Sequence, residues 1–211
     1  MPVPTVHVID DDESMRNAMV SLLRSVGLQV AAYAAADAFL QQPREAGPSC
    51  LVLDIRLPGT DGLDLQAELN RLGMTMPVVF ITGHGTIPMT VRAMRAGAVE
   101  FLTKPFSPSD FVQAVRTALE RDVAAWPARQ ELDGLRARYA LLSPREREVL
   151  THVAAGSMNK VAAARLGVTE ITVKVHRRRI MEKLELRSVA DLVRATERLG
   201  LRAPGGDYTK V

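Results

Sequence analysis

The chain contains one cysteine, Cys50, among 211 residues, so it cannot form an internal disulfide. Its longest apolar runs, such as 76–82, are strand-sized and fall far short of the ~18 residues that a membrane-spanning helix needs. The N-terminal segment MPVPTVHVIDDDE has no basic region and turns acidic at once, unlike a secretory signal or a transit peptide. These absences favour a protein of the reducing cytoplasm that has no membrane partner.

Charge is divided unequally along the chain. Residues 1–126 carry ten Lys and Arg against fourteen Asp and Glu, a net −4, whereas residues 127–211 carry seventeen against ten, a net +7. With 47% hydrophobic and 24% charged residues, the chain as a whole can fill cores and is not mainly disordered. An acidic half joined to a basic one predicts a regulatory or cation-binding unit tethered to a unit that binds an anion, with nucleic acid as the first candidate.

The acidic half alternates short β-branched runs with amphipathic segments. The expected strands are 5–10, 29–33, 50–54, 78–82 and 99–103. The expected helices are 14–25, 35–42, 63–72, 86–96 and 107–125. This alternation predicts an α/β fold with a parallel sheet covered on both faces, and in the flavodoxin-like order 2-1-3-4-5 the first and third strands are neighbours.

The basic half shows only helical periods, expected at 144–155, 159–166, 170–184 and 188–199. Ser143, Pro144 and Glu146 form an N-terminal capping pattern, and Gly156 and Gly167 are placed to end helices. Pro127 is expected to break the helix before it, although QELDGLRARYALL can form another. The predicted units are 1–125, a partly helical linker 126–142, an all-α unit 143–204 and a flexible tail 205–211.

Chemistry in the acidic half lies at the strand ends. Asp10, Asp11 and Asp12 follow the first strand and Asp54 ends the third, so their carboxylates should converge. Convergent carboxylates repel one another, and a hard divalent cation with oxygen ligands, Mg²⁺ above all, relieves that repulsion. Two further strand ends supply a hydroxyl, Thr82, and an ammonium, Lys104. The set could hold a phosphoryl group, although each residue alone has an ordinary explanation: Asp12, for example, is also a good helix N-cap.

The motifs VIDDDE, LVLDIRLPGTDG, VVFITGHG and VEFLTKPF make residues 1–125 resemble the receiver domain of two-component response regulators. The resemblance implies that Asp54 accepts a phosphoryl group, that Thr82 and Lys104 hold its oxygens, and that Phe101 is an aromatic switch that follows Thr82. It assigns Mg²⁺, with Mn²⁺ able to substitute, to Asp10, Asp11, Asp54 and the backbone carbonyl of Arg56. It also implies a cis peptide between Lys104 and Pro105.

In the basic half, the expected helix 170–184 has two faces. Val173, Ile180 and Leu184 form one apolar stripe, whereas Lys174 and Arg178 point elsewhere. The helix carries five basic residues: Lys174, Arg177, Arg178, Arg179 and Lys183. A basic helix of this kind suits the phosphate backbone and major groove of DNA, although charge runs are often only a solvated face.

Through LSPREREVL, NKVAAARLGV and ITVKVHRRRIMEKL, residues 143–199 resemble the LuxR/FixJ-type helix-turn-helix domain. The resemblance implies that Lys174, Val175 and Arg178 read base edges. It assigns backbone or supporting contacts to Lys160, Thr172, His176, Arg179 and Lys183. His176 is an equally good candidate for packing between helices near Ile180.

Together, the two resemblances identify a response regulator of the FixJ/StyR group. They imply that a sensor histidine kinase phosphorylates Asp54, and that a homodimer then binds double-stranded promoter DNA and activates transcription with RNA polymerase. The only catalysis expected is the receiver's own phosphoryl transfer and dephosphorylation. An Mg²⁺-dependent phosphatase would need a second acid where Arg56 stands. A constitutive DNA-binding protein with a non-signalling receiver conflicts with the complete set of strand-end residues.

Overall fold

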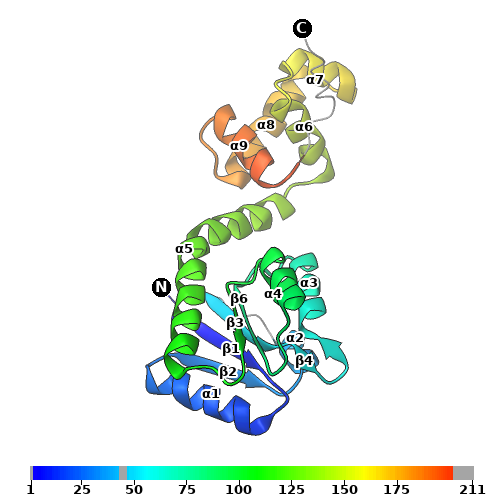
Figure 1. Cartoon of the computed structure of the whole chain (residues 1–211). Coiled ribbons are helices and arrows are strands. Elements are labelled where there is room, and N and C mark those ends of the chain that lie inside the picture. Colours follow the sequence, from blue (N-terminus) through cyan, green and yellow to red (C-terminus); the bar gives the residue numbers. More distant parts are fainter. Residues whose placement is uncertain (1, 43–46, 202–211) are drawn as a thin grey trace. The chain divides into compact units, whose positions relative to one another are not determined.

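The chain divides into two compact units, and the boundary between them in the sequence falls within one helix (Figure 1). The computed structural model describes residues 2–42 and 47–201. The first unit comprises Met1–Pro127 and the second Ala128–Val211. The predicted tail 205–211 and the predicted end of the all-α unit at residue 204 lie outside the described residues. No helix in the two described ranges is both long and apolar enough to cross a membrane.

The first unit is the predicted α/β fold. Its five parallel strands are β1 (Thr5–Ile9), β2 (Gln29–Tyr33), β3 (Ser49–Asp54), β6 (Val78–Thr82) and β7 (Glu100–Thr103). Their order is β2-β1-β3-β6-β7, which confirms the predicted order 2-1-3-4-5. The helices of this unit are α1 (Glu13–Ser25), α2 (Ala36–Leu40), α3 (Gly62–Arg71), α4 (Ile87–Arg95) and the first part of α5 (Pro108–Ala140).

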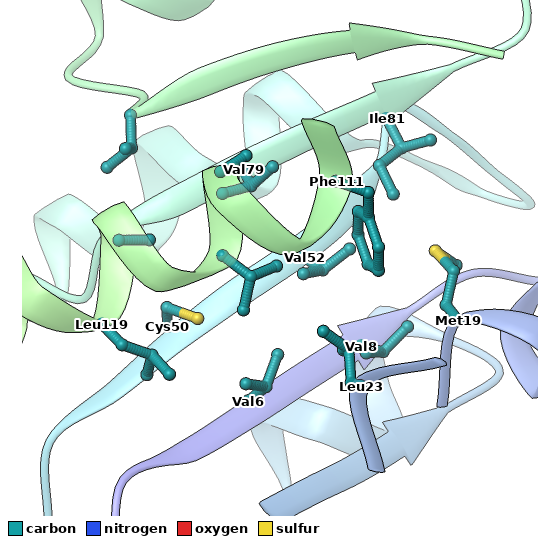
Figure 2. Close-up of a cluster of buried hydrophobic side chains, with 14 residues drawn as sticks. Val6, Val8, Met19, Leu23, Cys50, Val52, Val79, Ile81, Phe111 and Leu119 are labelled. Atoms are coloured by element: carbon teal, nitrogen blue, oxygen red, sulfur yellow. The ribbon is translucent and has the colours of Figure 1, made fainter. Parts of the chain in front are cut away.

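The central strands are apolar on both sides because helices cover both faces of the sheet. On one face, side chains of β1, β3 and β6 pack against α1 and α5, as Figure 2 shows for Val8, Val52 and Phe111. Cys50 is fully buried in this cluster, as predicted. On the other face, Leu53 and its neighbours pack against α2, α3 and α4. Burial on both faces fixes the strand register, and therefore where each strand ends.

A small hairpin that the sequence patterns did not predict follows β3. It pairs β4 (Arg56–Leu57) with β5 (Thr60–Asp61) in antiparallel fashion. Gly59 in its turn has φ +81°, a conformation that favours glycine. The hairpin returns the chain to Asp61, whose carboxylate accepts a hydrogen bond from the Leu63 backbone N–H and caps α3. The segment after Asp54 is thus ordered by local hydrogen bonds.

The prediction that Pro127 ends a helix is wrong. Helix α5 runs without interruption from Pro108 to Ala140 with Pro127 inside it. A proline removes one backbone hydrogen bond and costs about 3 kcal/mol in a helix. Each half of α5 is anchored in a core, through Leu119 in the first unit and Leu135 in the second. Burial on both sides of Pro127 outweighs the local penalty, so the linker expected at 126–142 is mostly helix.

Over its described residues, 128–201, the second unit is all-helical, as predicted, and consists of the end of α5 with four further helices. These are α6 (Pro144–Ala154), α7 (Asn159–Leu166), α8 (Glu170–Leu184) and α9 (Val189–Arg198). The predicted capping box is present, because Ser143 and Glu146 each accept a hydrogen bond from the other's backbone N–H. Gly167 ends α7 at φ +65°. The short α7, the tight turn and the longer α8 form a helix-turn-helix.

We predict that residues 128–140 stabilise the second unit. Leu135 is only 4% exposed and packs in the same core as α6, α8 and α9. Leu135→Ala should lower the free energy of unfolding of this unit by about 2–4 kcal/mol, measured by denaturant unfolding. The control is Leu141→Ala, at a position that is 67% exposed, which should cost under about 0.5 kcal/mol. Equal effects of the two variants would contradict the assignment of 128–140 to the second unit.

Candidate functional site

Four strand ends bring the predicted receiver residues together at one edge of the sheet. Asp10 follows β1, Asp54 ends β3, Thr82 ends β6 and Lys104 follows β7. Because the strands are parallel and neighbouring, their carboxyl ends meet. Asp10, Asp54 and Thr82 are all buried polar residues, a class that needs hydrogen-bond partners inside the protein.

The Lys104 ammonium connects the two buried carboxylates. Its Nζ donates to Asp10 Oδ2 at 2.8 Å and to Asp54 Oδ2 at 2.6 Å. The second oxygen of each carboxylate accepts a backbone N–H, that of Asp12 for Asp10 and that of Arg56 for Asp54, both at 2.9 Å. Every carboxylate oxygen of this pair therefore has a donor, and the two side chains are held in fixed orientations.

Protonation at the site reflects both burial and pairing. Burial raises the pKa of Asp10 above its ordinary value, and the nearby Asp54 raises it further, although Lys104 opposes both effects. Burial lowers the pKa of Lys104, but its hydrogen bonds to Asp10 and Asp54 outweigh that effect, so the pKa is raised. Lys104 therefore stays positively charged at neutral pH and partly neutralises the two carboxylates.

Asp11 completes a group of ligand atoms that fits a divalent cation. One carboxylate oxygen each from Asp10, Asp11 and Asp54 lie within 4.8 Å of one another. Asp11 is exposed, whereas the other two are buried. An all-oxygen set of three carboxylates suits a hard cation such as Mg²⁺ or Mn²⁺. Arg56, whose backbone carbonyl is the fourth predicted ligand, stands two residues after Asp54 with its side chain exposed.

Thr82 and Phe101 lie on either side of one tight loop. The Thr82 hydroxyl oxygen accepts a hydrogen bond from the His84 backbone N–H at 3.2 Å. A Cβ on Gly85 would lie 3.0 Å from the Phe101 ring and 2.6 Å from the Thr103 methyl group, so a larger residue there would force the Thr103 side chain to move. Phe101 is half-buried, with its ring centre 6.5 Å from that of Phe80. The loop after Thr82 therefore rests on the Phe101 side chain.

Two residues that shape the site, Arg16 and Gly62, were not predicted from the sequence. Arg16, on α1, donates to the backbone carbonyl of Asp10 at 2.7 Å and reaches that of Asp11 at 3.4 Å. Gly62, at the start of α3, approaches the chain after Asp54 so closely that a Cβ would lie 2.6 Å from the Asp54 carbonyl oxygen. Gly62 follows a turn motif, and that signal could have pointed to it; no local signal marks Arg16.

Helix α8 has the predicted two faces. Val173, Ile180 and Leu184 are buried in the core of the second unit. Lys174 and Arg178 are exposed on the other side, paired along the helix with Glu170 at 3.2 Å and Glu182 at 2.8 Å. The exposed face of α8 also includes Val175, which is 44% exposed.

The remaining predicted DNA-binding residues differ in how freely they could reach a partner. Lys160 and Arg179 are exposed. Thr172 is half-buried, and its hydroxyl lies 2.8 Å from that of Thr169, the N-cap of α8. His176 is half-buried, and its Nδ1 is buried without a hydrogen-bond partner among the described residues. The His176 ring therefore lies partly inside the domain.

Lys183 is engaged inside the second unit. Its ammonium donates to the Glu146 carboxylate at 2.7 Å and to the Leu141 backbone carbonyl at 3.2 Å. Burial raises the pKa of Glu146, but the hydrogen bonds from Lys183 and Ser143 outweigh that effect, so its pKa is lowered. The pair connects the last turn of α8 to the first turn of α6. Because the two residues are 37 positions apart, no local sequence pattern predicts the contact.

Comparison with known families accounts for both units. Residues 6–116 match the response regulator receiver domain, and residues 140–196 match the bacterial regulatory proteins of the LuxR family. The chain is a response regulator. This response regulator combines a receiver, which implies a sensor kinase as partner, with a LuxR-type DNA-binding domain, and it therefore belongs to the regulators of transcription.

Relatives resemble this response regulator along nearly its whole length. It is 50% identical to nodulation protein W of Bradyrhizobium diazoefficiens, over 98% of this chain and 91% of the relative. It is 40% identical to the transcriptional regulatory protein FixJ of Rhizobium meliloti, over 90% and 93%. A structure of the response regulator StyR matches it with a TM-score of 0.66 and 46% identity, covering 93% of this chain and all of that one. These matches confirm the predicted FixJ/StyR family.

We predict that Mg²⁺ stabilises the first unit through the three carboxylates. Because a cation that binds only the folded state raises its stability, by about 2.7 kcal/mol at a hundredfold excess over Kd, Mg²⁺ should raise the thermal unfolding midpoint. Asp11→Asn should weaken this response. The control is Asp12→Asn, which removes a neighbouring charge outside the cluster and keeps a good N-cap residue. If both variants respond to Mg²⁺ as the wild type does, the cluster is not the binding site.

We predict that the Glu146–Lys183 pair makes the stability of the second unit depend on pH. Because folding lowers the pKa of Glu146 from 4.5, its contribution is present above pH 4.5 and is lost as the pH falls through the folded pKa. Glu146→Gln should therefore be less stable than the wild type at neutral pH and less sensitive to acid, as measured by urea unfolding at several pH values. Glu148→Gln, at an exposed position on the same helix, should keep the wild-type dependence; an unchanged slope in Glu146→Gln would contradict the prediction.

Proposed function

We propose that a sensor histidine kinase phosphorylates Asp54 and that this modification controls DNA binding by the second unit. The observation that carries the proposal is the bridge from Lys104 to Asp10 and Asp54, at 2.8 and 2.6 Å. The bridge orients the Asp54 carboxylate and places a fixed positive charge beside it. Phosphoryl transfer needs little beyond such placement and charge.

In the proposed reaction, an oxygen of Asp54 attacks the phosphorus of a phosphohistidine on the kinase. The new oxygen–phosphorus bond forms as the nitrogen–phosphorus bond breaks, and the electron pair of the broken bond leaves with the imidazole. Lys104 stabilises the phosphoryl oxygens by its positive charge, and Thr82 supplies a hydroxyl. When bound by Asp10, Asp11, Asp54 and the Arg56 carbonyl, Mg²⁺ or Mn²⁺ adds positive charge at the same point. Reaction with water reverses the modification, and no other enzymatic activity is proposed.

The switch begins at Thr82. In the unmodified protein, the Thr82 hydroxyl accepts a hydrogen bond from the His84 backbone N–H. The phosphoryl group adds negative charge and acceptor oxygens beside this hydroxyl. Movement of Thr82 toward the phosphoryl group shifts the loop that rests on Phe101, so the Phe101 ring turns inward. A local electrostatic event thereby changes the packing at β7 and α4. We propose that this face, residues 86–99, then forms a homodimer.

The dimer would place two copies of α8 in major grooves of promoter DNA, at paired half-sites about one or more helical turns apart. Lys174, Val175 and Arg178 would contact base edges, after Lys174 and Arg178 exchange their helix partners Glu170 and Glu182 for DNA. Supporting contacts are proposed for Lys160, Thr172, His176 and Arg179. A supporting contact is also proposed for Lys183, which in addition pairs with Glu146 and so helps to position α8. The bound dimer would recruit RNA polymerase in the cytoplasm as an activator.

The test compares the wild type with Asp54→Asn in a gel-shift assay on a pool of promoter DNA, with and without acetyl phosphate and Mg²⁺. We predict that the phosphodonor tightens wild-type binding at least about tenfold, equivalent to about 1.4 kcal/mol, and leaves Asp54→Asn unchanged. The asparagine keeps the size of the side chain but lacks the nucleophilic carboxylate.

Asp61→Asn is the matched control, because it changes a nearby carboxylate that caps α3 and lies outside the metal cluster. It should respond to the phosphodonor as the wild type does. Equal DNA binding by all three proteins, regardless of donor, would support a constitutive DNA-binding protein with a non-signalling receiver.

A further inference from the structure

Ile171 is an apolar side chain on the outer face of α8 and is 72% exposed. It is the second residue of the helix, directly after Glu170. Ile171, Val175 and Arg178 follow one another at intervals of four and three residues, so they lie along one stripe. The buried Val173 lies on the opposite side of the helix. Ile171 therefore extends the base-reading face by one turn toward the N-terminus of α8.

The fold of the second unit does not account for this isoleucine. Ile171 belongs neither to the buried core of the unit nor to the half-buried side chains packed against it. A β-branched residue is also less favourable in a helix than an unbranched one. Helix stability therefore gives no reason for this residue type, and most of the side chain is available to a ligand.

The chemistry of the side chain selects its contact. Isoleucine cannot bond to phosphate, and the only apolar group that base edges display in the major groove is the thymine methyl. The first turn of a recognition helix is the part that reaches base edges. Unlike Lys174 and Arg178, which are paired with Glu170 and Glu182, Ile171 has no polar partner to exchange before it meets DNA.

We infer that Ile171 packs against the 5-methyl group of a thymine and specifies that base pair in the operator. The contact lies one helical turn from Val175 and is separate from it. The inference rests on the proposed function, because it requires α8 to enter the major groove. Exposure, position and side-chain chemistry all point to this contact.

The experiment removes one methyl group at a time. Full-length wild-type protein, treated with acetyl phosphate and Mg²⁺, selects its preferred duplex from a random pool, and each thymine of that duplex is then replaced singly by deoxyuridine. At one thymine, the loss of the methyl group should weaken wild-type binding about fourfold, the effect of exposing one buried methyl group. Ile171→Ala should bind the thymine and deoxyuridine duplexes equally well at that position. Its thermal unfolding midpoint should match the wild type, since Ile171 is exposed.

Met158→Ala is the matched control, because Met158 is also 72% exposed in the second unit but lies outside α8. This variant should keep the fourfold preference for the methyl group. If Ile171→Ala shows the same methyl dependence as the wild type at every thymine, or if the wild type shows none, the inference is overturned while DNA binding stands. If the treated wild type binds no duplex, the proposed function fails and the inference fails with it.

Discussion

The structure of the receiver depends on one ammonium group placed between two buried carboxylates. Asp10 and Asp54 lie at the ends of adjacent strands, where two negative charges would repel each other strongly inside the protein. Lys104 donates to both. A buried charge pair of this kind is costly to break, because removal of one partner leaves the other without compensation. The bridge from Lys104 reduces the repulsion between the two carboxylates. It also orients the Asp54 carboxylate, which we propose as the phosphoryl acceptor.

The main features of this site could be predicted because they depend on strand ends. Apolar runs that are buried on both faces mark the central strands, the alternation of strands and helices places the edge strands, and the residues that follow all of them meet at one edge of a parallel sheet. Asp10, Asp54, Thr82 and Lys104 come together for that reason. The hairpin formed by β4 and β5 escaped prediction, since strands of two residues have no periodicity. The contacts of Arg16 depend on how α1 packs, which no local pattern reveals.

Two further differences arise where tertiary packing overrides a local preference. Pro127 has the usual properties of a helix breaker, yet helix continues on both sides because Leu119 and Leu135 are each buried in a core. Lys183 looks like any other cation on a basic helix, yet it is held by Glu146 of another helix. In both cases the deciding contact involves residues distant in sequence, whereas local rules consider only neighbours. The buried stripe of α8 followed its pattern because periodicity and packing agree there.

Lys104 bonds to two residues that are far from it in the sequence, so the site can form only when the whole receiver folds. Asp10 precedes Lys104 by 94 residues and Asp54 precedes it by 50. A fragment that ends before β7 lacks the ammonium that bridges both carboxylates, and in an unfolded chain bringing three such distant side chains together has a high entropic cost. The presence of the site therefore depends on a receiver that is both complete and folded. A nascent, truncated or misfolded copy lacks the arrangement on which the proposed phosphorylation of Asp54 depends, so only the folded receiver could undergo that reaction.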